Sequence, residues 1–307
     1  MKILVTGGTG FVGSNLTNEL VKIPNYEVVI TGNSTEVKRN PSARILNLHL
    51  NGIDWTELQN VEAVFHQAAD NDTQSQNYRE MFKANVWSSI ELFERMYEQG
   101  CRNFVFASST AIYGDNPAPY FEESKVEPNP LTFYAKSKLE FEKWVFDWAS
   151  NNDANVVGLR YCNVYGPGEY HKGKRASMIY QLINQMMFDR AEPKIFKDGE
   201  QRRDWIYVKD VVNANLLALD YASKGNSGIF NMGTGVATSF NEIINIINEN
   251  LFPEEPGAWF KPEYIDCSFV DSFQSHTQCD MKKAETLLGF RSKWSIKSGI
   301  NDFMNYI

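Results

Sequence analysis

Short apolar runs alternate with amphipathic stretches along the first half of the chain. The runs are rich in Val, Ile, Leu and Phe and end at glycine or polar residues, a pattern typical of strands buried in a parallel sheet. The stretches between them place apolar residues three or four positions apart, as one face of a helix does. The pattern predicts strands over residues 2–7, 26–32, 43–50, 61–69, 102–109 and 154–161.

Helices are predicted after the first strand, over roughly residues 77–99, and from Tyr134 onward. Strands and helices that alternate in this way predict an α/β fold with a doubly wound parallel sheet. Residues 203–222 add a strand and a helix that we expect to rejoin this sheet.

The second half of the chain has a weaker pattern of loops and short helices, broken by prolines from Pro193 onward. It predicts a smaller lobe with an interrupted structure. The expected larger domain consists of residues 1–166 and 203–234, and the expected C-terminal substrate lobe consists of residues 167–202 and 235–307.

Charge and composition narrow the classes of partner. The 307 residues are 43% hydrophobic and 22% charged, and the net charge of −8 disfavours a nucleic-acid partner. We expect no membrane span, because no apolar run approaches roughly 18 residues, and the first residues do not have the form of a signal peptide. The cysteines form no CxxC pair and the histidines show no metal-ligand spacing, so we expect a cytoplasmic protein without a metal. The cysteines are Cys101, Cys162, Cys267 and Cys279, and the histidines are His49, His66, His171 and His276.

A glycine-rich segment, GGTGFVG (residues 7–13), lies between the first strand and its helix. Glycines at positions 7, 10 and 13 allow a tight turn, close approach of a pyrophosphate, and close packing of the helix on the strand. The N-terminus of the helix then offers backbone amides and the positive end of its dipole to the phosphates. Because the segment occurs at a predicted strand–helix junction, it predicts dinucleotide binding.

The end of the second predicted strand bears on the choice of dinucleotide. An Asp or Glu there would bind the ribose 2′-hydroxyl of NAD, but this chain has TGNS (residues 31–34). Lys38 and Arg39 follow and could pair with a 2′-phosphate, although they could equally be solvated loop charges. We therefore expect NADP, with NAD as the alternative, and place Asn33 and Lys38 at the cofactor.

Tyr134 and Lys138 are four residues apart and therefore share one face of the predicted helix. The preceding strand ends at Ser109, and the carboxyl ends of strands in a doubly wound sheet face the ligand crevice. Ser109, Tyr134 and Lys138 can therefore converge beside the cofactor. An ammonium beside a phenol lowers the pKa of the phenol from about 10, which would make Tyr134 a usable base near neutral pH. A Tyr and a Lys at this spacing also occur on ordinary helix surfaces, but the glycine turn and the serines at the strand end favour the functional interpretation.

The glycine turn, the segment SSTAIYG (residues 108–114) and the Tyr-x-x-x-Lys pair occur in the order and spacing of the extended short-chain dehydrogenase/reductase family, which the chain resembles. The resemblance implies a Rossmann fold, with Tyr134 as the acid–base, Ser109 holding the reacting oxygen, and Lys138 also holding the nicotinamide ribose. It places HQAA (residues 66–69) along the cofactor. The cofactor-binding residues expected in total are Gly7, Gly10, Phe11, Val12, Gly13, Asn33, Lys38, Gln67, Ala68, Ala69, Asn85, Tyr134, Lys138 and Val164.

The residues after Thr110 separate the reactions of this family. Related dehydratases have an Asp–Glu pair there and decarboxylating relatives have a Glu, whereas this chain has Ala111 and Ile112, which cannot transfer protons. Relatives that epimerise by enolisation use a Cys and a His; Cys162 and His171 are present, but the context at the fifth strand does not match. The resemblance therefore favours redox epimerisation, in which a carbinol carbon loses a hydride and the transient ketone regains it on the other face.

Longer segments resemble the branch of the family that epimerises ADP-glycero-manno-heptose at carbon 6. In that branch the Lys of a His-Lys-Gly sequence is a proposed second acid–base, which is Lys172 here, although a loop Lys that binds phosphate is the alternative. An Arg at position 203 suits a diphosphate, because its guanidinium matches two phosphate oxygens, but Arg203 could instead pair with a nearby Asp. The segments that carry the resemblance are residues 159–177, 193–211, 227–240 and 273–280.

Three positions depart from that branch: Lys174 stands where it has a Ser, Gln181 where it has a His, and Phe273 where it has a Tyr. These positions line the expected substrate pocket, so the base and the sugar can differ from those of ADP-heptose. The expected substrate-binding residues are Ser109, Thr110, Asn163, His171, Lys174, Gln181, Phe196, Arg203 and Phe273.

Three functions stay open on the sequence. The first is a heptose-type epimerase of a nucleotide sugar; the second is a UDP-hexose 4-epimerase or another sugar-nucleotide-modifying member of the family. The third is a non-enzymatic protein that binds NADP for sensing or scaffolding, which the intact Ser109, Tyr134 and Lys138 disfavour, since a sensor needs no base. We expect a nucleotide-sugar ligand and a homo-oligomer of at least two chains.

Overall fold

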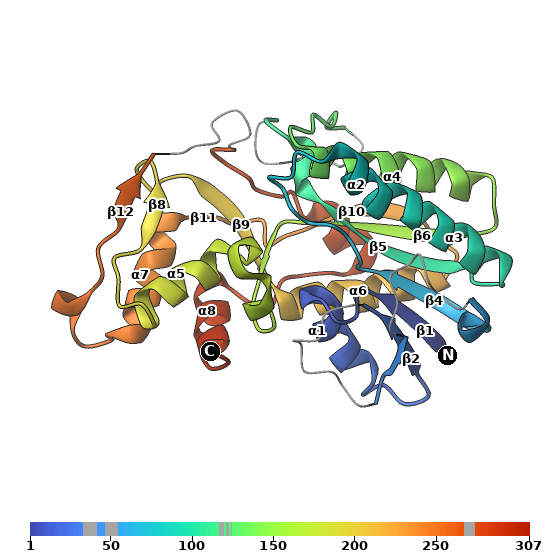
Figure 1. The fold of residues 1–307 in the computed structure, drawn as a ribbon, viewed down its shortest axis with the longest axis horizontal. Coiled ribbons are helices and arrows are strands. Elements are labelled where there is room, and N and C mark those ends of the chain that lie inside the picture. The colour runs from blue at the N-terminus through green and yellow to red at the C-terminus, as the bar shows by residue number, and fades with distance from the viewer. Residues whose placement is uncertain (33–41, 47–54, 117–119, 121–122, 124, 267–273) are drawn as a thin grey trace.

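The structure is a computed structural model, and it describes residues 1–32, 42–46, 55–116, 120, 123, 125–266 and 274–307. At one end of the molecule a sheet lies between helices, and at the other end smaller sheets pack with three helices (Figure 1). The N-terminus starts a strand of the large sheet, and the C-terminus follows a helix of the smaller lobe.

Within the described residues, seven strands form one parallel sheet in the order β10-β6-β5-β4-β1-β2-β3. The strand order reverses between β1 and β4, and in open α/β sheets such a reversal opens a ligand crevice at the carboxyl ends of the strands. The strands are β1 (Lys2–Thr6), β2 (Glu27–Thr31), β3 (Arg44–Leu46), β4 (Val61–His66), β5 (Asn103–Ser109), β6 (Asn155–Tyr161) and β10 (Gly228–Met232).

Both faces of this sheet are covered by helices, because successive strand side chains point to opposite faces. Ile3 and Val5 of β1 pack in the same apolar cluster as residues of α1 (Phe11–Leu20) and α6 (Val208–Ser223). Leu4, between them, packs in the cluster formed with the helices of the other face. Those helices are α2 (Tyr78–Phe82), the π-turn η3 (Lys83–Trp87), α3 (Ser88–Glu98) and α4 (Phe133–Ser150).

The smaller lobe has its own apolar core, which includes Ile179, Trp205, Ile243 and Phe303. One of its sheets has the strand order β11-β9-β7 and the other pairs β12 with β8. Its elements are β7 (Asn163–Tyr165), α5 (Met178–Met187), β8 (Lys194–Phe196), β9 (Arg202–Tyr207), β11 (Ala237–Ser239), α7 (Phe240–Leu251), β12 (Glu263–Ile265) and α8 (Ile296–Met304). The short helices are η2 (Trp55–Leu58), η4 (Thr110–Tyr113), η5 (Tyr170–Arg175), η6 (Pro256–Ala258) and η8 (Ala284–Leu288).

The structure confirms the doubly wound parallel sheet and corrects one of its strands. The strand predicted at residue 203 is β9, which lies between β7 and β11 instead of rejoining the large sheet. The seventh strand of that sheet is β10, which pairs with β6 from Gly228 to Met232 and was not predicted. A strand can pair parallel to its neighbour in a sheet only after a crossover connection, usually a helix. α6 is that crossover here, so the strand that joins the large sheet is β10, which follows α6, and not β9, which precedes it.

The C-terminal part of the chain belongs to both cores. Leu288 and Phe290 pack in the cluster of the large sheet, whereas Ile300 and Phe303 pack in the smaller lobe. The predicted division at residues 166, 203 and 234 stays a proposal. None of the described helices is long and apolar enough to cross a membrane.

Candidate active site

The glycine turn connects β1 to α1 in a conformation that only glycines allow. Gly7 has a φ of 66°, and a Cβ there would lie 2.8 Å from the backbone nitrogen of Ala68. The Gly10 amide donates to the Gly7 carbonyl at 2.8 Å, and a Cβ on Gly13 would overlap that carbonyl. α1 begins directly afterwards at Phe11, so its unpaired first amides stand at the turn. The cradle fits the pyrophosphate of a dinucleotide.

The segment after β4, in which Gln67 to Ala69 are expected to line the cofactor, lies against this turn. The amides of Gln67 and Ala68 donate to the carbonyl and hydroxyl of Thr6, at 3.2 and 3.3 Å. Asn85 holds the end of this segment: its amide group accepts from Asp70 N at 2.7 Å and donates to Ser137 Oγ of α4 at 3.0 Å. Asn85 therefore supports both the cofactor segment and the helix of Tyr134.

Tyr134 stands in the first turn of α4, whose N-cap Thr132 accepts from the Ala135 amide at 3.1 Å. The side chain of Ser109, the last residue of β5, lies near enough to the Tyr134 hydroxyl to lower its pKa. Lys138, buried one turn further, donates to the carbonyl of Ala107 at 2.9 Å, and its ammonium lies 5.9 Å from the centre of the Tyr134 ring. The structure therefore brings together the predicted Ser, Tyr and Lys at the carboxyl end of β5.

The charge state of this trio differs from the expectation. Burial raises the pKa of Tyr134, and Ser109 opposes the rise. Burial also lowers the pKa of Lys138 to about 8, which Glu142 opposes. The predicted lowering of the phenol pKa by Lys138 is therefore not the net result: burial is the largest cause and raises the pKa, and the ammonium lies over the ring and donates to a carbonyl.

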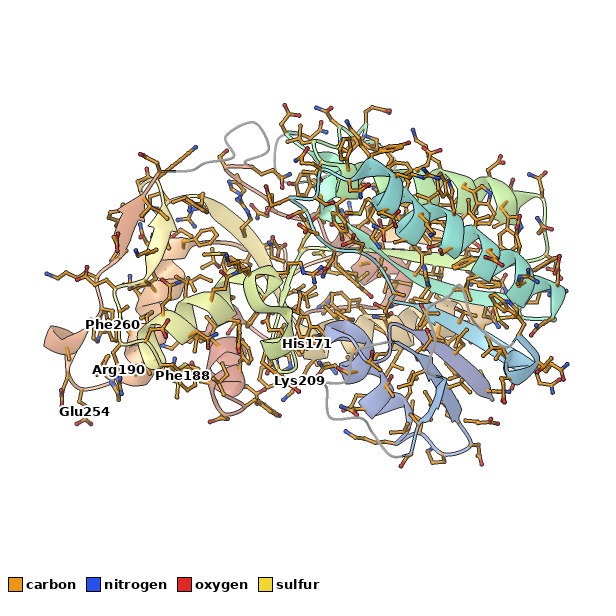
Figure 2. All side chains as sticks on the ribbon, viewed as in Figure 1. His171, Phe188, Arg190, Lys209, Glu254 and Phe260 are labelled. Atoms are coloured by element: carbon orange, nitrogen blue, oxygen red, sulfur yellow. A yellow bond between two sulfur atoms is a disulfide. The ribbon has the colours of Figure 1, made fainter. Side chains whose placement is uncertain are left out.

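A loop between β7 and α5 covers the start of α1. The side-chain amide of Asn15 donates to the Pro167 carbonyl at 2.8 Å, and Lys172 Nζ lies 5.3 Å from the centre of the Phe11 ring. Figure 2 shows His171 on this loop, between the two lobes. Burial lowers the pKa of Lys172, which favours its neutral form more than in water, while Glu169 opposes the shift. The loop thus carries a partly desolvated lysine to the glycine turn.

Comparison with known proteins identifies the family. The model of the NAD dependent epimerase/dehydratase family matches residues 3–233. The chain belongs to this family. It is 33% identical to the ADP-L-glycero-D-manno-heptose-6-epimerase of Alkalilimnicola ehrlichii, over 99% of this chain and 97% of the relative. These findings confirm the predicted resemblance and the expectation of an enzyme.

Two solved structures share the fold over nearly the whole chain. The ADP-L-glycero-D-manno-heptose-6-epimerase of Helicobacter pylori has a TM-score of 0.84 at 33% identity, covering 99% of this chain and 95% of that one. The UDP-glucose 4-epimerase of Thermotoga maritima, with UDP-glucose, has a TM-score of 0.88 at 30% identity, covering 100% of this chain and 98% of that one. The likeness therefore extends to epimerases of more than one sugar.

The residues predicted to bind substrate come from both lobes of this epimerase-family chain. Thr110 is buried and donates to the Tyr161 carbonyl at 3.2 Å. Gln181 of α5 donates to the Ala176 carbonyl at 2.8 Å, so it secures its own loop. Burial lowers the pKa of Arg203 in β9 to about 10, and Tyr120 opposes the shift. Asn163 and Lys174 are exposed, whereas Val164, Phe196 and Arg203 are half-buried.

Three predicted residues, Asn33, Lys38 and Phe273, lie outside the described residues, as does the neighbouring Arg39. The end of β2 is described up to Gly32. The Gly8 amide donates to the Thr31 carbonyl at 2.9 Å, and a Cβ on Gly32 would overlap the hydroxyl of Thr9. β2 and the glycine turn are therefore in direct contact.

Glu169 is a site residue that the sequence did not reveal. It is fully buried, and its carboxylate accepts from the Gly166 amide at 3.1 Å and from the Ser177 amide and hydroxyl at 2.6 and 2.8 Å. Burial raises the pKa of Glu169, while these bonds and Lys172 oppose the rise. Glu169 ties both ends of the loop that carries Lys172. An acidic residue next to the His-Lys-Gly sequence was the only signal available.

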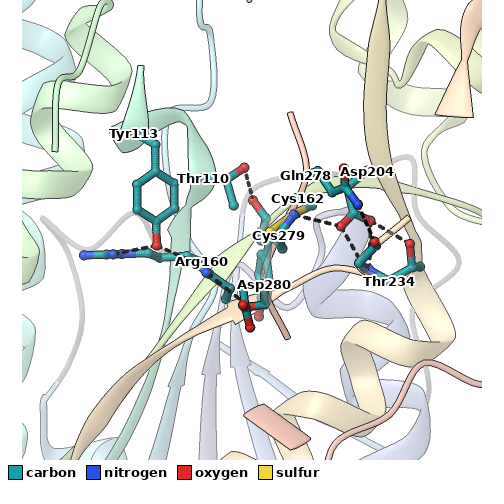
Figure 3. The surroundings of a disulfide bond; sticks show 12 residues. Thr110, Tyr113, Arg160, Cys162, Asp204, Thr234, Gln278, Cys279 and Asp280 are labelled. Atoms are coloured by element: carbon teal, nitrogen blue, oxygen red, sulfur yellow. Dashed lines mark hydrogen bonds between the residues drawn. A yellow bond between two sulfur atoms is a disulfide. The ribbon is translucent and has the colours of Figure 1, made fainter. Parts of the chain in front are cut away.

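Two cysteines 117 residues apart, Cys162 and Cys279, form a disulfide beside Asp204 (Figure 3). Their scatter along the chain gave no sign of this pairing. The Asp204 carboxylate accepts from the amides of Thr234, Gly235 and Cys279 at 2.8, 2.9 and 3.2 Å. A carboxylate so engaged, beside sulfurs bonded to each other, does not suit a metal, and the expected absence of a metal stays a prediction.

We predict that Glu169→Ala lowers the free energy of unfolding by about 2–4 kcal/mol, because each buried donor left without an acceptor costs roughly 1–3 kcal/mol. It should also weaken binding of NAD(H), since the loop over α1 loses its anchor. Urea denaturation and a fluorescence titration with NADH measure the two effects. Glu192→Ala, at an exposed carboxylate of the same lobe, should change neither. An unchanged NADH affinity in the folded Glu169→Ala protein would show that the loop does not need its anchor.

Proposed function

We propose that the protein epimerises a nucleotide-activated sugar through a transient keto intermediate, with a nucleotide sugar most like ADP-glycero-manno-heptose. The observation that carries the proposal is the convergence of Ser109, Tyr134 and Lys138, whose ammonium lies over the Tyr134 ring, next to a dinucleotide cradle. The similarity to a heptose epimerase over 99% of the chain supports this choice of substrate.

The residues of the site supply proton transfer at one carbinol carbon. A bound nicotinamide would accept the hydride and return it. Tyr134 removes the proton of the substrate hydroxyl as the hydride leaves, and a second acid–base on the opposite face gives a proton to the ketone oxygen when the hydride returns there. Ser109 donates to the same substrate oxygen and so stabilises the charge that develops there. Lys138 keeps a positive charge beside the phenol.

Lys172 is the candidate for a second acid–base, and it lies on a different element from Tyr134. It reaches the start of α1 from the loop after β7, whereas Tyr134 belongs to α4 after β5. Two bases from different elements suit a ketone that is reduced on opposite faces. The shift of Lys172 toward the neutral form is the condition for a lysine to accept a proton near neutral pH.

A UDP-hexose 4-epimerase is the second candidate, supported by the TM-score of 0.88 to the Thermotoga maritima enzyme. In that case a single base at Tyr134 suffices, because the keto sugar rotates within the site between the two hydride transfers and presents its other face. Thermal shift against ADP- and UDP-activated sugars distinguishes the two, since a ligand that binds the folded state raises its stability.

We also propose NADP as the preferred dinucleotide of this NAD-dependent family member. The reason is the sequence TGNS in place of an acidic residue at the end of β2, followed by Lys38 and Arg39. The homo-oligomer of at least two chains and the cytoplasmic location stay predictions from the sequence.

The proposed function predicts that Tyr134→Phe lowers kcat for epimerisation by about 10² or more, the usual worth of a general acid–base. Cofactor binding should be unchanged, because the phenyl ring keeps its place. Steady-state turnover of the best nucleotide sugar from the thermal-shift panel measures kcat. Turnover close to that of the parent protein would refute the role of Tyr134.

The two-base reading predicts that Lys172→Met blocks net inversion and leaves the half-reaction through Tyr134 partly active. A keto-intermediate dismutation assay beside the epimerisation assay measures both. Lys194→Met, at an exposed lysine of β8 in the same lobe, is the matched control. If Lys172→Met raises KM and keeps kcat, Lys172 binds phosphate, and the 4-epimerase becomes the better proposal.

The cofactor proposal predicts that Lys38→Ala weakens NADPH binding and leaves NADH binding unchanged, because only NADPH has the 2′-phosphate. Fluorescence titration of both nucleotides against the parent and variant proteins measures the ratio. A parent protein that binds NADH more tightly, with no effect of Lys38→Ala on NADPH, would contradict it.

A further inference from the structure

Three consecutive residues at the end of β5 hold three residues of α4 that lie one helical turn apart. The Ala107 carbonyl accepts from Lys138, the Ser108 hydroxyl donates to Glu142, and the Ser109 side chain lies beside the Tyr134 hydroxyl. The spacing of four residues places the three α4 side chains on one face of the helix. Tyr134 and Lys138 have roles in the proposed reaction, whereas Glu142 has none assigned.

Glu142 is a buried carboxylate with a buried partner. Both Glu142 and Arg160 of β6 are at most 5% exposed. Arg160 donates to Glu142 through Nη2 at 2.6 Å and through Nε at 3.0 Å. Ser108, which pairs with Arg160 in the sheet, donates to the same carboxylate. Three donors from β5 and β6 thus leave Glu142 a single position.

Arg160 is itself fixed from the other side. Its Nη1 donates to the hydroxyl of Tyr113 at 2.8 Å, and that hydroxyl donates to Asn231 Oδ1 at 2.6 Å (Figure 3). The backbone amide of Asn231 donates to the Glu123 carboxylate at 2.6 Å. The chain of bonds therefore contains a second buried carboxylate, Glu123, which is separated from Glu142 by Arg160, Tyr113 and Asn231.

The charged and titratable groups around Lys138 come from three elements. Glu142 and Tyr134 lie on α4 itself, and Arg160 of β6 acts on Lys138 through Glu142. His66 of β4 is within electrostatic reach but is neutral, because burial and Lys138 lower its pKa to about 3. Among the described residues that influence Lys138, Glu142 is the one negative charge.

We propose that Glu142, held by Arg160 and Ser108, is a positioning residue that keeps Lys138 charged and aligned beside Tyr134. The inference deepens the proposed function and rests on it for its catalytic meaning. Lys138 donates to the Ala107 carbonyl and lies over the Tyr134 ring, and neither partner carries a full charge. Burial disfavours the charged ammonium, and among the described groups Glu142 offsets this effect.

Because Arg160 is the partner of Glu142, substitutions at the two residues should shift the pKa of Lys138 in opposite directions. Glu142→Gln keeps the shape and removes the negative charge, so the pKa of Lys138 should fall below its value of about 8. Arg160→Gln removes the positive charge that competes with Lys138 for Glu142. The full negative charge of Glu142 then acts on Lys138, so the pKa of Lys138 should rise. An opposite charge nearby shifts a pKa by about 1–3 units, which sets the expected size of each change.

The experiment is an NMR titration of the Lys138 ε-carbon in the cofactor-free protein, assigned with Lys138→Arg. Glu123→Gln is the matched control, because it neutralises the other carboxylate of the chain of bonds without touching α4. It should leave the pKa of Lys138 unchanged. In parallel, the alkaline limb of kcat/KM should move to lower pH in Glu142→Gln and to higher pH in Arg160→Gln.

The two readouts separate the inference from the proposed function. Opposite shifts in the titration, without turnover of any nucleotide sugar, would support Glu142 and refute the epimerase. Shifts of the same sign, or none, in both folded variants would overturn the inference and leave the ion pair a structural contact. If Glu142→Gln does not fold, the rise expected in Arg160→Gln and the constancy in Glu123→Gln still decide the question.

Discussion

The buried ion pair between Arg160 and Glu142 is the contact on which the geometry of the site depends. Arg160 projects from β6, between β10 and β5 of the large sheet, and Glu142 lies two helical turns after Tyr134 on α4. A buried ion pair adds little net stability, because desolvation offsets the attraction, but its hydrogen bonds allow only one orientation. Locking α4 to β6 at Glu142 fixes the helix about its axis, and the helix then delivers Tyr134 to Ser109 at the end of β5.

The second constraint is the close approach of backbones around the reversal between β1 and β4. Gly7 and Gly13 leave no room for side chains, so β1, α1 and the segment at Ala68 meet at one point. The loop held by Glu169 closes over this point from the smaller lobe. A dinucleotide cradle and a lysine from the other lobe are therefore parts of one arrangement, although 159 residues separate Gly13 from Lys172.

The features that the sequence predicted are local. The glycine spacing, the four-residue step from Tyr134 to Lys138 and the periodicity of α4 each lie within one element or one turn, where backbone geometry alone relates the residues. The partners of Glu142 and Glu169 and the pairing of Cys162 with Cys279 come from distant elements, and no periodicity connects them. The misplaced strand has the same cause: the pattern of β9 shows a strand but does not show which sheet it joins.

In the proposed reaction, the pKa shifts of Tyr134 and Lys138 explain why a third charge is needed. Burial favours the neutral phenol of Tyr134 and the neutral amine of Lys138. A neutral phenol can give a proton to a ketone, but it cannot take one from a hydroxyl, and epimerisation requires both steps in each cycle. The phenolate form is stabilised only if the neighbouring lysine stays charged. A carboxylate one turn further along the same helix face meets this requirement without contacting the phenol, and so leaves Tyr134 open toward the substrate.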